Sequence, residues 1–158
     1  MVKEGSKIDT GFKLDIVKDG SEQTVNFADL LDRPAVVSVY MKNNTGSCDK
    51  QNQSLAEHAA EFDKLGYNLV AISKDSCKSH LGYAQKLGIN YILASDPDNL
   101  FPKATDSIVE KKMYGKTYEG PSRSAFIIGT DGTVKGVIEK IDPKNHAQEL
   151  FEKIKTLS

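Results

Sequence analysis

The chain alternates apolar runs with amphipathic stretches, in the order typical of an α/β fold. The runs AVVSVY (35–40) and YNLVAIS (67–73) are rich in β-branched residues and have no polar face, which predicts two strands buried on both sides of a sheet. Between them, apolar residues recur at helical spacing as far as Leu65 and Gly66 follows as a stop signal, so we predict a helix over about 48–65. Together these elements form a βαβ unit.

The rest of the pattern predicts a mixed sheet. The remaining elements are, in chain order, an N-terminal pair of strands at 12–17 and 23–25, a helix at 75–88, a strand at 91–95, a hairpin of strands at 124–128 and 133–138 turned by Asp131-Gly132, and a terminal helix with Ala147, Leu150, Ile154 and Leu157 on one face. This order indicates an α/β fold with a mixed central sheet, helices on both faces and an N-terminal β-hairpin.

Length and charge narrow the class of protein. With 158 residues, we expect one domain over 1–158. The 21 basic and 22 acidic residues are mixed along the chain without a basic stripe, so nucleic acid is not an expected partner. No apolar run reaches the roughly 20 residues of a membrane-spanning helix, and the N-terminus MVKEGSKIDT lacks the apolar region of a secretory signal. We therefore expect a cytoplasmic protein with no membrane partner.

The stretch VVSVYMKNNTGSC (36–48) places a cysteine where the first of these strands gives way to its helix. Cys48 follows turn-forming residues instead of lying inside an apolar pattern, where a cysteine that only fills space belongs. In α/β sheets, reactive groups gather where strands end and helices begin. The free N–H groups and the dipole of a helix start stabilise an anion, so they favour the thiolate of Cys48. The position predicts a nucleophile.

Around Cys48 the sequence resembles the peroxiredoxins, and within them the branch called bacterioferritin comigratory protein (BCP) or PrxQ. That branch has a Pro-x-x-x-Thr-x-x-Cys loop, which YMKNNTGSC matches at Thr45 and Cys48. The resemblance continues, in the family's order, through AISKDSCKSH, LASDPDNLFPKA, EKKMYGKTYEG and SRSAFIIGTDGTV. It implies a thioredoxin-like fold in which Cys48 is the peroxidatic cysteine and Thr45 hydrogen-bonds the peroxide. It also implies that Arg123 stabilises the thiolate and the developing oxyanion.

The resemblance further implies a reaction cycle. Such a thiol peroxidase reduces hydrogen peroxide and organic hydroperoxides through a cysteine sulfenic acid, and thioredoxin or a similar dithiol recycles it. The cycle needs no cofactor and no metal. A monomer is expected in preference to a stable oligomer.

Three positions depart from the pattern of the branch. Met41 stands where the loop proline is expected and Gly46 replaces a second proline, which predicts a more mobile loop. Gln53 stands where many members keep a resolving cysteine. Cys77, in the first turn of the next predicted helix, is either the resolving thiol or a packing residue. Tyr40 and Met41 are expected to lie beside the site as supporting residues.

Two alternatives belong to different classes of function. The lost prolines at Met41 and Gly46 make a redox-inactive thioredoxin-fold binding or holdase protein conceivable, and rapid oxidation of Cys48 by peroxide would exclude it. A disulfide reductase of the thioredoxin type would need Cys-x-x-Cys, but Gln51 stands at the second cysteine position.

Other polar features predict no further chemistry. His58, His80 and His146 lack metal-ligand spacing and are expected at the surface or as helix caps. The run EKKMYGKTYEG (110–120) lacks the spacing of a P-loop, so a solvated connection is expected there.

Overall fold

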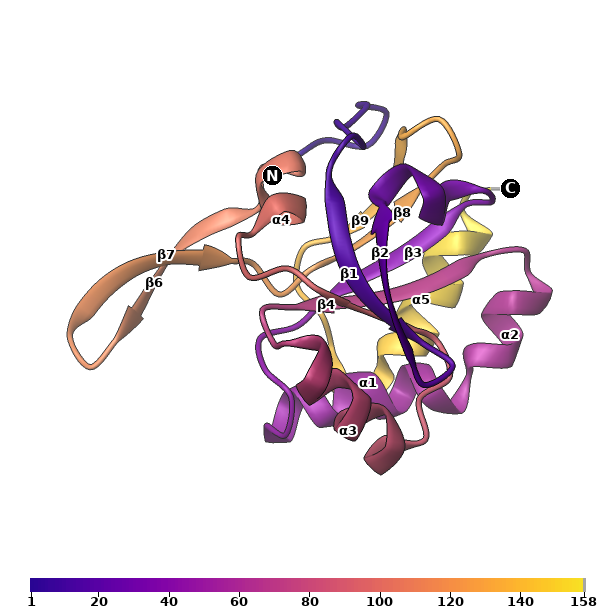
Figure 1. The fold of residues 1–158 in the computed structure, drawn as a ribbon. Coiled ribbons are helices and arrows are strands. Elements are labelled where there is room, and N and C mark those ends of the chain that lie inside the picture. The colour runs from indigo at the N-terminus through magenta and orange to yellow at the C-terminus, as the bar shows by residue number, and fades with distance from the viewer. Residues whose placement is uncertain (158) are drawn as a thin grey trace.

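The computed structural model describes residues 1–157, except for the side chain of Met113. These residues form a seven-stranded sheet, a separate two-stranded hairpin, and helices that pack on the sheet (Figure 1). The strands are β1 (Lys13–Lys18), β2 (Ser21–Asn26), β3 (Ala35–Val39), β4 (Asn68–Ser73), β5 (Ile92–Ser95), β6 (Ile108–Met113), β7 (Lys116–Pro121), β8 (Ala125–Ile128) and β9 (Val134–Ile138). The helices are α1 (Gly46–Glu57), α2 (Ala59–Lys64), α3 (Cys77–Leu87), α4 (Leu100–Ala104) and α5 (His146–Lys155), with the 3₁₀ helices η1 (Phe27–Leu31) and η2 (Pro143–Asn145).

The strand order determines which face each helix covers. The order is β2-β1-β5-β4-β3-β8-β9, in which β3, β4 and β5 are parallel neighbours and the other pairs are antiparallel. The connections from β3 to β4 and from β4 to β5 step in the same direction, so right-handed crossovers put α1, α2 and α3 on one face. The connection from β5 through α4 to β8 steps back over the sheet and reaches the opposite face. The predicted mixed sheet, with helices on both faces and an N-terminal hairpin, is confirmed.

A hydrophobic core lies on each face of the sheet. On one face, Leu55 of α1, Phe62 of α2 and Leu150 of α5 have no exposed surface. On the other face, Phe27 of η1 and Phe101 of α4 are equally buried, with ring centroids 5.3 Å apart. Among residues 1–157, no helix is both long and apolar enough to cross a bilayer.

The helix predicted over 48–65 is in fact two helices. It starts earlier, at the beginning of α1, and breaks at His58, whose backbone (φ −118°, ψ 12°) lies outside the helical region. The ring of His58 lies 2.8 Å from the Glu61 carboxylate in the first turn of α2, which stabilises the new start. Beyond the break, Phe62 stacks on Phe151 of α5 at 4.4 Å between ring centroids. Apolar spacing alone does not reveal this break, because the buried residues on both sides of it keep the helical period.

The segment 110–120 is mostly exposed, as predicted, but it belongs to two strands and is not an irregular connection. This segment belongs to the hairpin β6–β7, which projects from the body of the protein at the left of Figure 1. Its turn places Tyr114 and Gly115 at positive φ (52° and 76°), the pattern of a type I′ turn. The usual sequence signal for such a turn is Asn-Gly or Asp-Gly. Tyr114-Gly115 does not match it, so the hairpin was not predicted.

Candidate active site

Cys48 lies in the first turn of α1, at the edge of the sheet where β3 and β4 end. Thr45 is the N-cap of α1, so the N–H groups of the first turn have no acceptor within the helix. The side chain of Cys48 has no exposed surface and belongs to the core between the sheet and the helices. The helix start is as the sequence predicted, whereas the complete burial of the sulfur was not predicted.

Arg123 is the nearest cation to the sulfur. It lies two positions before β8, which pairs antiparallel with β3, so the sheet brings the two segments together. Its Nη2 donates to Sγ of Cys48 at 2.9 Å, and its Nη1 donates to Oγ of Ser47 at 2.9 Å. The guanidinium is half-buried. A charge-assisted hydrogen bond of this kind favours the thiolate over the thiol.

Thr45 lies beside this pair, with its hydroxyl already engaged. Its Oγ1 donates to the backbone carbonyl of Lys42 at 2.8 Å. With the proton used in this way, the oxygen keeps its lone pairs free to accept a hydrogen bond. The geometry therefore suits Thr45 as an acceptor for the O–H of a hydroperoxide.

Sequence reasoning missed Asn43, which holds the loop before Cys48. Its side chain is buried, accepting from the Tyr40 hydroxyl at 2.6 Å and donating to Ser79 at 3.0 Å and to Nδ1 of His80 at 3.1 Å. Its backbone N–H donates to the carboxylate of Asp75 at 2.9 Å. These bonds connect the loop to α3 and to the turn before it. The loop is thus held by hydrogen bonds, although it lacks the prolines that the resemblance led us to expect.

Tyr40, predicted to support the site, lies under it. Its ring has no exposed surface and stacks on Tyr83 of α3 at 6.2 Å between ring centroids. Burial raises the pKa of both phenols far above their usual range. Both hydroxyls therefore stay protonated, and Tyr83 donates to the Asp49 carboxylate at 2.8 Å. Their contribution is to position the first turn of α1.

Met41 contacts a second cation that the sequence did not suggest. Nζ of Lys111, on β6, lies 2.7 Å from the thioether sulfur of Met41. Burial lowers the pKa of Lys111, and the neighbouring Arg123 lowers it further, whereas Cys48 raises it. Lys111 is therefore within the electrostatic field of both Arg123 and Cys48. Its only sequence signal was its place in the EKKMYGKTYEG segment that carries the family resemblance.

Cys77 begins α3 at the same edge of the sheet as Cys48, as expected for helices that follow parallel neighbours. Both cysteines are buried free thiols. Burial, with the carboxylates of Glu22 and Asp15 acting in the same direction, raises the pKa of the Cys77 thiol to about 11. Cys77 therefore faces acidic groups of the β1–β2 hairpin, whereas Cys48 faces a guanidinium.

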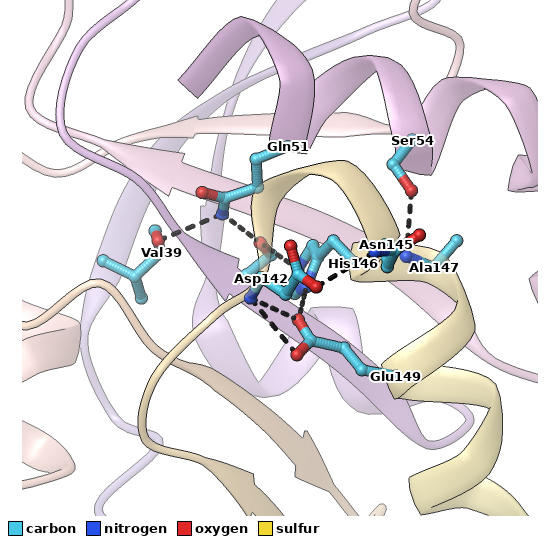
Figure 2. Close-up of polar contacts among 9 residues, drawn as sticks. Val39, Gln51, Ser54, Asp142, Asn145, His146, Ala147 and Glu149 are labelled. Atoms are coloured by element: carbon cyan, nitrogen blue, oxygen red, sulfur yellow. Dashed lines mark hydrogen bonds and ion pairs between the residues drawn. The ribbon is translucent and has the colours of Figure 1, made fainter. Parts of the chain in front are cut away.

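Figure 2 shows a buried chain of polar contacts one turn beyond Cys48. Gln51 donates from Nε2 to Oγ of Ser38 at 2.8 Å and to a backbone carbonyl of β3 at 3.2 Å. Oγ of Ser38 lies 2.9 Å from Nε2 of His146, whose Nδ1 lies 2.7 Å from the Glu149 carboxylate. Since a carboxylate only accepts, Nδ1 of His146 donates to Glu149. This chain connects α1 to β3 and α5.

The expectation that the histidines are surface or capping residues is wrong for two of them. His80 and His146 have no exposed surface, and each hydrogen-bonds within a buried network. His58 follows the expectation more closely, since it is the N-cap residue of α2. Within residues 1–157, no three His, Cys, Asp or Glu side chains are grouped as metal ligands would be.

Comparison with known proteins identifies the family. A model of the AhpC/TSA family matches residues 9–137. Peroxiredoxin Bcp of Xanthomonas campestris is 34% identical over 120 residues, which cover 76% of this chain and 75% of that protein. A structure of the Xanthomonas campestris bacterioferritin comigratory protein, reported for its alkyl peroxide reduction activity, has a TM-score of 0.86 at 27% identity and covers 98% of both chains. A PrxQ C47S mutant from Xylella fastidiosa has a TM-score of 0.87 at 26% identity, covering 99% of this chain and 97% of that one.

The matches agree with the geometry described above. They extend over most of the chain, including the β3–α1 segment with Cys48 and the start of β8 beside Arg123. The thioredoxin-like fold is therefore confirmed, and so is the resemblance from which it was predicted. The chain belongs to the AhpC/TSA family and is a peroxiredoxin, a thiol peroxidase related to the Bcp, or PrxQ, proteins.

Proposed function

We propose that Cys48 is the peroxidatic cysteine of this thiol peroxidase and that Arg123 and Thr45 complete its site. The observation that carries the proposal is the 2.9 Å contact between Nη2 of Arg123 and Sγ of Cys48 at a helix start. Hydrogen peroxide and organic hydroperoxides are the proposed substrates. The alkyl peroxide reduction reported for the Xanthomonas campestris relative supports the second class.

The chemical step transfers one oxygen atom to the sulfur. The Cys48 thiolate attacks the terminal oxygen of the hydroperoxide, so that the S–O bond forms while the O–O bond breaks. The departing alkoxide or hydroxide takes up a proton and leaves as alcohol or water, and the protein keeps a sulfenic acid. Negative charge moves from the sulfur to the leaving oxygen, so donors must be present at both ends.

Arg123 supplies the donors, and Thr45 orients the substrate as an acceptor. The Arg123 guanidinium, already at the sulfur, can also stabilise the oxygens as the charge moves onto them. Thr45 accepts from the hydroperoxide O–H, which orients the terminal oxygen toward the sulfur. Tyr40 and Met41 support the loop and take no part in bond making.

A dithiol reductant returns the sulfenic acid to the thiol, and we propose thioredoxin or a similar protein in this role. Cys77 is the candidate for an internal resolving thiol. Its raised pKa and acidic neighbours make it a weak nucleophile while α3 keeps its first turn, so resolution through Cys77 requires that turn to open. We further propose that residues 1–158 act as one domain and as a monomer in the cytoplasm.

Mass spectrometry after one equivalent of hydrogen peroxide tests the proposal. Wild type is expected to gain one oxygen atom at Cys48, or to lose two hydrogen atoms if Cys77 then forms a disulfide. Cys48→Ser should consume no peroxide, because a serine hydroxyl without a base is scarcely ionised. Cys77→Ser should still gain one oxygen atom. If wild type stays unmodified and folded under these conditions, Cys48 is not the peroxidatic residue and a redox-inactive binding protein becomes the better account.

A further inference from the structure

Lys111 reaches the active site from a part of the chain that is otherwise separate from the sheet. The β6–β7 hairpin projects away from the body in Figure 1, yet Lys111 on β6 returns to Met41 at the start of the Cys48 loop, with 2.7 Å between Nζ and Sδ. The aliphatic part of the Lys111 side chain packs against Gly120 of β7. A methyl group added to this glycine would lie 3.6 Å from Cδ of Lys111, which is van der Waals contact. The stem is thus packed, and the ammonium group is directed to the loop.

The surroundings of the ammonium group contain another cation and a neutral sulfur. Lys111 is half-buried, and its hydrogen-bond partner at Met41 is a thioether, which is a weak acceptor. Within residues 1–157, no carboxylate forms an ion pair with it. A half-buried cation beside a guanidinium is costly unless a negative charge lies nearby. The nearby group that can carry such a charge is the thiolate of Cys48.

We propose that Lys111 is a second cation of the peroxidase site, held by Met41 and supplied by the β6–β7 hairpin. It favours the Cys48 thiolate and the oxygen that departs when the O–O bond of the hydroperoxide breaks. The inference rests on the proposed role of Cys48 and adds a residue to it. The direct contact of Lys111 is with Met41 and not with the reacting atoms. It therefore acts on Cys48 through the electric field of its charge.

The direction of the effect follows from reciprocity. Opposite charges that lie near each other favour one another's charged forms, so protonated Lys111 favours the Cys48 thiolate. In the reaction, charge moves from the sulfur to the departing oxygen, and a cation on the loop side remains close to it throughout. Met41 in place of a proline gives the ammonium group a polarisable surface to rest on.

The chain offers a matched control for this inference. Lys112 is the next residue on β6, is exposed, and points to the opposite face of the hairpin because side chains alternate along a strand. Lys111→Gln and Lys112→Gln therefore remove the same charge from the same hairpin at different distances from Cys48. Lys111→Arg restores the charge.

Two measurements, made on all three variants and on wild type, test whether Lys111 stabilises the Cys48 thiolate. The first is the rate constant for Cys48 oxidation by hydrogen peroxide under pseudo-first-order conditions. The second is the titration of the Cys48 thiolate by its ultraviolet absorbance in a Cys77→Ser background, which needs no peroxide. Lys111→Gln is expected to slow oxidation about tenfold and to move the thiolate titration to higher pH, with Lys112→Gln within about twofold of wild type and Lys111→Arg close to wild type.

Equal behaviour of Lys111→Gln and Lys112→Gln in both measurements would overturn the inference. A slower rate with an unchanged titration in Lys111→Gln, and no rescue by arginine, would mean that the lysine only packs, and would overturn it too. Failure of the proposed function has a different signature, since wild type itself would then not be oxidised by peroxide. The thiolate titration would still report whether Lys111 acts on Cys48.

Discussion

Replacing Arg123 by methionine tests the contact on which the proposed site depends. Methionine keeps an unbranched apolar side chain and removes both donors, the one at 2.9 Å from Sγ of Cys48 and the one at 2.9 Å from Oγ of Ser47. A hydrogen bond to a charged group contributes about 1.5–3 kcal/mol. Because the guanidinium is half-buried, solvent screening favours the lower half of this range. Arg123→Met should therefore slow Cys48 oxidation by about tenfold to fiftyfold.

The assay is stopped-flow oxidation of the reduced protein by hydrogen peroxide, with thermal unfolding as a check on the fold. Arg123→Lys should give an intermediate rate, because an ammonium group keeps the charge but loses the planar pair of donors. Ser47→Ala removes only the partner of the second donor and should change the rate by less than about threefold. If Arg123→Met stays folded and oxidises within about twofold of wild type, the guanidinium does not stabilise the reacting sulfur and the proposed role is wrong.

Three further predictions follow from the neighbours of the site. In Cys48→Ser protein, Cys77 should be alkylated very slowly at pH 7, with a rate that rises toward its pKa of about 11, and a fast reaction at pH 7 would contradict its acidic surroundings. Asn43→Ala should lower the free energy of unfolding in urea by about 2–4 kcal/mol, because it leaves buried partners unsatisfied, whereas Asn44→Gly at its positive φ should cost under about 1 kcal/mol. Burial lowers the pKa of His80, so below about pH 6.5 the unfolded chain binds a proton at this residue more readily than the native protein does. The free energy of unfolding should therefore fall as the pH drops, and this fall should be shallower in His80→Gln.

The parts of the fold that were predicted correctly each have a signal in their own short stretch of sequence. The buried strands β3 and β4 are continuous apolar runs, and the end of α3 at Gly88, with a left-handed φ of 67°, follows from glycine chemistry. Cys48 was marked by its own turn-forming neighbours. Arg123 became a candidate only through the family resemblance, because nothing local distinguishes it from a solvated arginine. The 2.9 Å contact that joins them spans 75 positions of the sequence.

The residues that sequence reasoning missed are those whose role depends on tertiary contacts. Asn43 looks like one more polar loop residue, and its importance comes from partners on α3 and the turn before it. His146 lies on a helix face whose burial depends on how α5 packs against β3. Lys111 was hidden because its hairpin was taken for a connection. In each case the side chain is ordinary, and the surrounding structure gives it a role.

The burial of Cys48 constrains how the catalytic cycle can close. A hydroperoxide is small enough to reach the sulfur through a slight opening of the loop, but a dithiol protein needs the sulfur at the surface, and Cys48 has no exposed surface. Recycling therefore requires the first turn of α1 to unwind. On one side the opening is limited by the hydrogen bonds of Asn43, and on the other by the buried chain at Gln51, which lies only three positions after Cys48. The segment free to unwind without breaking either set of contacts is the short stretch between these two residues, so the strength of both sets should determine how fast the sulfenic acid is exposed to its reductant.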